Sequence, residues 1–185
     1  LTKEETGAVV DKTKALMLHR IGDMARLQTD AIIISSCLGV VWVGLIGTYK
    51  MIVNSVSGYV NLIFNSVISS FGNLIATESR EKQFQLFLVY RFFAIWVYGF
   101  SAVGFFLLLS PLVELYVGAD RVLATSIIAW YLTDYFFKGE RVVLSNFKTA
   151  AGVFEQDKYL SILQGIVNLV LSIALVFKIG LVGVF

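Results

Sequence analysis

Long apolar stretches alternate with short polar ones along most of the chain. A helix that spans a membrane needs about 20 mostly apolar residues, so the pattern predicts five spanning helices and the start of a sixth. The predicted spans are 15–38, 45–76, 86–109, 122–147 and 159–177, with the sixth beginning at 181–185. Residues 1–14 form a polar lead-in. The chain is therefore expected to be an all-α, polytopic transmembrane helix bundle.

Glycine, proline and charged residues mark the predicted connections. The glycine-rich stretch 39–47 predicts a tight hairpin, and 110–120, with Pro111 and Gly118, predicts a loop. The charged stretches 77–83 and 148–158 predict two further short loops. Consecutive helices joined in this way are expected to run antiparallel.

The composition strengthens the membrane interpretation. Hydrophobic residues make up 57% and charged residues 15% of the chain, against about 25% charged residues in soluble domains. The mean hydropathy is +0.79. A single proline and 14% aromatic residues fit long helices better than the alternating strands of about ten residues in a membrane β-barrel.

Several classes of chemistry are excluded by residue content. The formal net charge of +2 is too balanced for a nucleic-acid binder. The only cysteine, Cys37, and the only histidine, His19, leave no disulfide framework and no Cys/His zinc site. A glycine-rich phosphate loop is also missing. We therefore expect no enzyme, no catalytic residue, no metal and no cofactor.

Lysine and arginine set the expected orientation. With the N-terminus inside, seven basic residues fall on the inner side (Lys3, Lys12, Lys14, Arg80, Lys82, Lys148 and Lys158) and three on the outer side (Lys50, Arg121 and Lys178). Basic residues are enriched in cytoplasmic loops, so the N-terminus is predicted to be cytoplasmic. The chain opens without a signal peptide and stops within an apolar run, so we expect it to be part of a longer protein.

Polar residues recur at helical spacing inside the predicted spans, which places them on single helix faces. The stripes are His19, Asp23, Arg26 and Asp30; Asn54, Ser57, Asn61, Asn65, Ser69 and Asn73; Asp134, Lys138, Arg141 and Ser145; and Gln164, Asn168 and Ser172, with Arg91 alone near the start of the third helix. An ionised group at mid-membrane costs roughly 2.5–3.5 kcal/mol. Four aligned stripes are therefore expected to line one shared, wet cavity.

Basic groups in such a cavity suit an anionic headgroup, because arginine binds a diphosphate in fork geometry. Four basic residues (Arg26, Arg91, Lys138 and Arg141) face three acidic ones (Asp23, Asp30 and Asp134), which leaves one excess positive charge. The candidate substrate-binding residues are Arg26, Asp30, Asn61, Asn65, Arg91, Asp134, Lys138, Arg141 and Asn168.

Two structural explanations of the stripes stay open. Asparagine and serine lines also form hydrogen bonds between membrane helices. Asp23 with Arg26, and Asp134 with Lys138 or Arg141, can form pairs within one helix that lower the cost of insertion.

Three stretches resemble the polysaccharide flippases (O-antigen and capsule type) of the multidrug/oligosaccharidyl-lipid/polysaccharide exporter superfamily. The first stretch is His19-Arg20-Ile21-Gly22, followed by residues 29–35 and Val43-Gly44. The second stretch is residues 69–77. The third is residues 147–159, continuing to Asn168, Ser172 and residues 180–183. The resemblance covers about residues 13–185. It implies most of the C-terminal lobe of a two-lobe transporter with 12–14 helices, whose N-terminal lobe would complete the cavity.

The resemblance also implies a function. The expected substrate is an undecaprenyl-diphosphate-linked oligosaccharide, flipped across the bacterial cytoplasmic membrane by alternating access without ATP hydrolysis, with membrane lipids as the other partners. One alternative is a drug or cation exporter of the same superfamily, which should carry a more acidic or aromatic cavity. Another is a polysaccharide polymerase, which should carry a long outer loop with catalytic arginine or aspartate. No predicted loop exceeds roughly a dozen residues.

Overall fold

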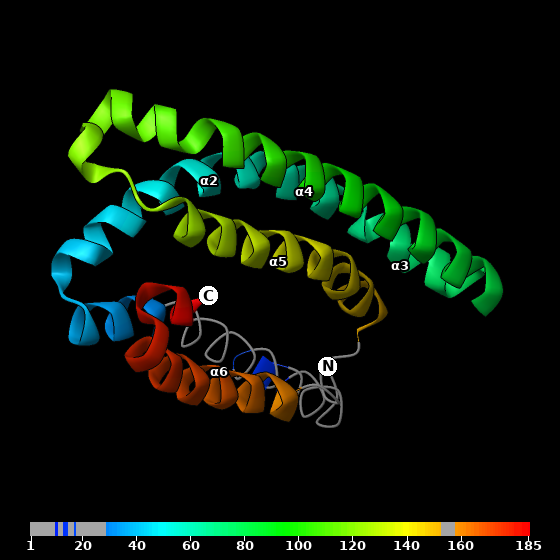
Figure 1. Ribbon diagram of the computed structural model, residues 1–185. Helices are drawn as coiled ribbons and strands as arrows, with labels where there is room; N and C mark the ends of the chain where they lie inside the picture. Colours follow the sequence, from blue (N-terminus) through cyan, green and yellow to red (C-terminus); the bar gives the residue numbers. More distant parts are fainter. Residues whose placement is uncertain (1–9, 11–12, 15–16, 18–28, 153–157) are drawn as a thin grey trace. The chain divides into compact units, whose positions relative to one another are not determined.

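The computed structural model describes residues 10, 13–14, 17, 29–152 and 158–185. This part of the chain is all helical, without a strand, as predicted (Figure 1). It divides into two compact units. Unit 1 comprises residues 1–40 and 152–184, and unit 2 comprises residues 41–151 with Phe185.

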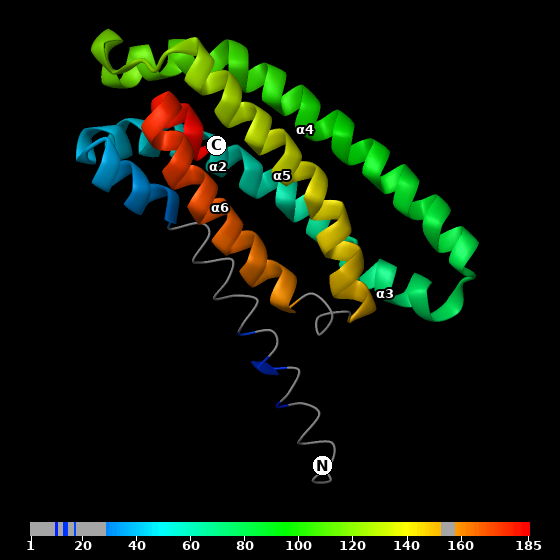
Figure 2. The ribbon, with the colours of Figure 1, turned by 60° about the horizontal axis from the view of Figure 1, so that its bottom comes forward.

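Unit 2 is built from four α-helices. They are α2 (Val40–Ser66), α3 (Ile68–Thr77), α4 (Arg80–Val117) and α5 (Thr125–Ala151), with a short 3-10 helix, η1 (Ala119–Arg121), before α5. α4 and α5 lie side by side, and α3 packs against α5 (Figures 1 and 2). The core between them includes Val53 and Phe64 of α2, Tyr98 and Leu109 of α4, and Val143 of α5.

The turn between α3 and α4 is tighter than predicted. Ser79 is the N-cap of α4, and its hydroxyl accepts a hydrogen bond from the Lys82 backbone N–H at 3.4 Å. The Gln83 side chain donates to the carbonyl of Ile75 at 3.3 Å, which closes the end of α3. The predicted loop at 77–83 is therefore wrong for its second half, which forms the first turn of α4.

α4 continues through the proline that was expected to end it. The helix runs to Val117 and ends where Gly118 takes a φ of 107°, a value that favours glycine. Pro111 lacks an N–H, but membrane helices tolerate the freed carbonyl because neighbouring groups satisfy it. The predicted loop at 110–120 is therefore wrong up to Val117, and the predicted span 86–109 is extended at both ends.

The connection before α2 is also shorter than the predicted hairpin at 39–47. The backbone N–H groups of Leu38 and Gly39 both donate to the Ile34 carbonyl, at 2.9 and 3.0 Å, and Gly39 has a φ of 101°. α2 begins at the next residue. The predicted span 45–76 is in fact two helices, α2 and α3, interrupted at Val67.

α5 differs from its predicted range of 122–147 by starting at Thr125 and ending at Ala151. The start is shifted because Val122 is extended, and the N–H of the next residue, Leu123, donates to the Tyr49 hydroxyl of α2 at 3.0 Å. The predicted loop 148–158 is helical for its first four residues, whereas 153–157 lie outside the described residues.

Unit 1 contains the helix 29–37, which is the end of the predicted span 15–38; most of that span lies outside the described residues. α6 (Lys158–Ile179) agrees closely with the predicted 159–177. Residues 181–185 do not begin an α-helix, because Gly180–Val184 form a 3-10 turn, η2. Gly183 lies over the backbone of Leu175, where a Cβ would come within 2.5 Å of the carbonyl carbon.

Three segments are long and apolar enough to cross a membrane: Val40–Thr77, Arg80–Val117 and Leu163–Val184. They indicate a membrane protein. The described residues thus hold three such spans, and the predicted count of five is not confirmed. α5 is long enough but is not among them, because Asp134, Lys138, Glu140 and Arg141 fall in its middle.

Candidate functional site

A buried tyrosine joins the three long helices of unit 2. Tyr98 of α4 is 2% exposed, and its ring stacks on Phe64 of α2 with centroids 5.4 Å apart. Its hydroxyl donates to Asn61 Oδ1 of α2 at 2.7 Å. On α5 the ring lies against Gly139, where a Cβ would be 2.6 Å from Tyr98 Cε1. Asn61, a predicted binding residue, therefore also holds α2 to α4.

Arg91, predicted to stand alone, has an acidic partner on another helix. Its Nε donates to Glu140 Oε1 of α5 at 2.7 Å, and its Nη2 donates to the same oxygen. The Arg91 side chain is 50% exposed and that of Glu140 19%. This pair joins α4 to α5 and neutralises the guanidinium charge.

The position of Arg91 along α4 places this ion pair near a membrane boundary. The stretch of α4 between Arg91 and Glu114 is uncharged. At 1.5 Å per residue it is roughly 33 Å long, close to the hydrocarbon thickness of about 30 Å. An arginine at this level can reach the headgroup region with its charged end.

The polar stripe of α5 forms an ion pair within the helix. Lys138 Nζ lies 2.5 Å from Asp134 Oδ2, which is one of the two structural explanations that the sequence left open. Arg141 follows one turn later on the same stripe and is exposed.

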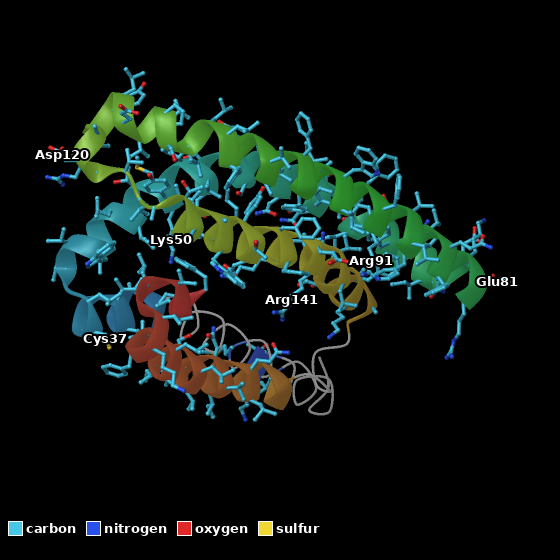
Figure 3. All side chains as sticks on the ribbon, viewed as in Figure 1. Cys37, Lys50, Glu81, Arg91, Asp120 and Arg141 are labelled. Carbon is cyan, nitrogen blue, oxygen red and sulfur yellow. The ribbon has the colours of Figure 1, made fainter. Side chains whose placement is uncertain are left out.

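The stripe and the Arg91–Glu140 pair lie on different flanks of α5. The packed face of α5 carries Ile128, Leu132, Tyr135, Gly139, Val143 and Asn146. At about 100° per residue, Lys138 falls on one flank of this face and Glu140 on the other, while Asp134 and Arg141 fall between Lys138 and the side of α5 opposite the packed face. Arg91 lies at the contact of α4 with α5, whereas Arg141 projects from the side of α5 turned away from α4 (Figure 3). The structure does not bring Arg91 to the stripe.

The amides of α2 follow one edge of its packed face. Asn54 and Asn65 are exposed, while Ser57 is buried and donates to the Val53 carbonyl at 2.5 Å. Lys50 lies one turn before Asn54 on the same edge. Together with Tyr131 of α5, which precedes the polar stripe, Lys50 lines a shallow depression. At this depression the edge of α2 meets α5 about one turn before the polar stripe begins.

We call this surface the polar side of unit 2. It consists of Lys50, Asn54, Asn61 and Asn65 of α2 and Asp134, Lys138 and Arg141 of α5. It offers three cationic groups, one carboxylate and three amides. Such a set can hold an anion by charge and a neutral polar group by hydrogen bonds.

The remaining predicted residues belong to unit 1. Asp30 is buried in the helix 29–37, and Arg26 lies outside the described residues together with His19 and Asp23. Asn168 of α6 accepts a hydrogen bond from the Ser172 hydroxyl at 2.9 Å. These two residues of the predicted stripe Gln164, Asn168 and Ser172 therefore hydrogen-bond to each other within one helix.

Sequence reasoning missed Glu140 and Lys50. A lone arginine in an apolar helix requires a partner, but nothing in the sequence pairs residue 91 with residue 140. Lys50 stands four residues before Asn54, so the helical spacing of the second stripe could have included it.

Comparisons with protein-family models, with curated proteins and with solved structures gave no match. Within the described part of the chain, no cluster of histidine, cysteine, aspartate and glutamate could hold a metal ion.

Proposed function

We propose that this chain is part of a transporter that flips an undecaprenyl-diphosphate-linked oligosaccharide across the bacterial cytoplasmic membrane. In this proposal the polar side of unit 2 lines part of the substrate path and performs no covalent chemistry. The observation that carries the proposal is the gathering of charged and amide side chains on one side of a unit whose other exposed surface is largely apolar.

The contrast between the two surfaces of α5 supports an aqueous or polar path. Trp130, Phe137 and Leu144 are exposed on α5 beside the polar stripe, and such side chains are stable against lipid. Lys138 and Arg141 are exposed as well, but charged groups facing hydrocarbon are costly. The polar side therefore requires water or a polar ligand, whereas the apolar surface does not.

The charges of the polar side favour an anionic substrate. The polar side carries Lys50, Lys138 and Arg141, and the Arg91 charge is balanced by Glu140. A diphosphate can be bound by lysine and arginine side chains of this kind, while exposed Asn54 and Asn65 can donate to sugar hydroxyls. The Asp134–Lys138 pair would stabilise the empty path and weaken substrate binding enough for release. A drug or cation exporter would require the opposite sign of charge.

The expected orientation is consistent with this proposal. Arg80 and Lys82 at the start of α4 and Lys148 near the end of α5 lie at one end of unit 2, because α4 and α5 are antiparallel neighbours. In the proposal this end of unit 2 is the cytoplasmic one, because basic residues are enriched on that side of the membrane.

Replacing Arg141 with alanine in the intact protein is expected to abolish polysaccharide export without lowering its membrane abundance. Lysine at this position should restore export only in part, because it keeps the charge but loses the bidentate fork. Export is measured as surface polysaccharide in cells that lack the native gene, and abundance by immunoblot of membranes.

Arg121→Ala is the matched control, since Arg121 lies in η1 at the opposite end of α5. It should export normally. Export at the wild-type level by Arg141→Ala would show that the arginine is structural and would remove the polar side from the substrate path.

A further inference from the structure

The interruption between α2 and α3 has an unusual hydrogen-bonding pattern. α2 ends at Ser66 and α3 begins at Ile68, with Val67 between them at φ −90° and ψ −2°. Helix hydrogen bonding resumes with the Phe71 N–H donating to the Val67 carbonyl at 3.0 Å. A proline is not the cause, because the chain's one proline is Pro111.

Side-chain donors bind the last backbone carbonyls of α2. The Ser66 hydroxyl donates to the Ile63 carbonyl at 2.7 Å. The next carbonyl, that of Phe64, accepts two hydrogen bonds from two other helices: one from the Tyr90 hydroxyl of α4, and one from Asn146 Nδ2 of α5 at 3.0 Å. Side chains inserted into the backbone ladder in this way are a recognised cause of helix kinks.

The Phe64 carbonyl has a second possible donor. In an unbroken helix it would accept from the N–H of Ile68, four residues later. The two arrangements exclude each other, because straightening the helix moves this carbonyl onto the backbone and away from α4 and α5. After such a change Tyr90 and Asn146 could still hydrogen-bond to each other, since Asn146 also lies within hydrogen-bonding reach of the Tyr90 hydroxyl.

The surroundings of the interruption suit a pivot. α5 packs against both α3 and α4, and the rings of Phe71 and Phe147 hold α3 to α5 with centroids 4.3 Å apart. α2 is held to this body through long side chains, of which Tyr49 and Asn61 make single neutral hydrogen bonds. The net contribution of each such bond is small, so these hydrogen bonds alone do not fix α2 to the body.

We infer that Val67 is the pivot of a hinge and that Tyr90 and Asn146 are its latch on the Phe64 carbonyl. With the latch closed, α2 is kinked against the α3–α4–α5 body. With the latch open, the carbonyl pairs with the Ile68 N–H and the far end of α2 swings. This inference concerns the motion of the helix and does not depend on which molecule is transported.

The hinge is tested by double electron–electron resonance in nanodiscs on the intact protein, with Cys37 replaced by serine. One pair of spin labels is placed at Met51 of α2 and Leu115 of α4, and a second at Leu88 of α4 and Leu144 of α5 within the body; all four positions are exposed. Removing a kink of about 20° over the stretch from Val67 to Met51 would move Met51 by roughly 8 Å.

Opening the latch requires removal of both donors with little change in shape. In Tyr90→Phe/Asn146→Leu the Met51–Leu115 distances should shift or split by about this amount, while the Leu88–Leu144 distances stay constant. Tyr116→Phe, which removes an exposed hydroxyl on the same helix, should change neither. The single variant Tyr90→Phe should shift the Met51–Leu115 distances in the same way but by less. It replaces the double variant in the experiment if the double variant cannot be purified.

Two outcomes would overturn the inference. Unchanged Met51–Leu115 distances would mean that the two donors do not hold α2 in its kinked form. Equal broadening of both pairs would mean that the substitutions loosen unit 2 as a whole rather than release one helix.

Discussion

Replacing Arg91 with methionine is expected to destabilise the protein by about 1–3 kcal/mol, between the values typical of exposed and of buried ion pairs. The loss arises because Glu140, at 19% exposure, would keep its charge next to the apolar surface of α4 without a partner. Glu140→Gln should cost less, since Arg91 is half-exposed and its guanidinium can reach the headgroup region.

The double variant Arg91→Met/Glu140→Gln should recover most of the stability lost in Arg91→Met, because it removes both charges together. Thermal unfolding of the purified protein in detergent measures all three variants and completes the double-mutant cycle. Additive losses in the double variant would show that the two side chains act independently, and the ion pair would then contribute nothing to holding α4 against α5.

Gly139→Ala should also lower stability by about 1–3 kcal/mol, the usual cost of overpacking. A Cβ at this position would clash with the ring of Tyr98, which is buried and fixed by its hydrogen bond to Asn61. Alanine is otherwise favoured over glycine in a helix by about 1 kcal/mol, so a net loss would show that the close approach of α5 to Tyr98 dominates.

Gly104→Ala is the matched control for this substitution. Gly104 lies in the middle of α4, and a Cβ there meets no neighbouring atom within 4 Å. The thermal unfolding midpoint of the Gly104→Ala variant should stay constant or rise slightly. A Gly139→Ala variant as stable as Gly104→Ala would contradict the described packing of Tyr98 on α5.

The helical character of the chain could be predicted because apolar periodicity and helix length are local properties. The ends of the helices could not, because they depend on individual hydrogen bonds. Pro111 was expected in a loop and Gly44 in a hairpin, yet they lie inside α4 and α2. Conversely, Val67 carries no sequence signal for an interruption, since the donors that sustain it, Tyr90 and Asn146, come from distant parts of the chain.

The candidate site shows the same division between local and long-range information. The stripe of Asp134, Lys138 and Arg141 could be predicted from spacing within one helix, and the Asp134–Lys138 pair was among the stated alternatives. Glu140, however, lies on another flank of α5, and only the packing of α4 against α5 reveals that it neutralises Arg91. Arg91 was therefore grouped with the stripe because both are basic, although packing separates them.

The central claim is that the polar side of unit 2 faces water and the apolar surface faces lipid. Cysteine accessibility tests it with two pairs of positions at matched depth: Asn54 with Val56 on α2, and Lys138 with Phe137 on α5, all exposed in the structure. Single cysteines are placed in a Cys37→Ser background, and a membrane-impermeant thiol reagent is applied to both faces of proteoliposomes. The account predicts labelling at residues 54 and 138 and little at 56 and 137; equal labelling within each pair would contradict it.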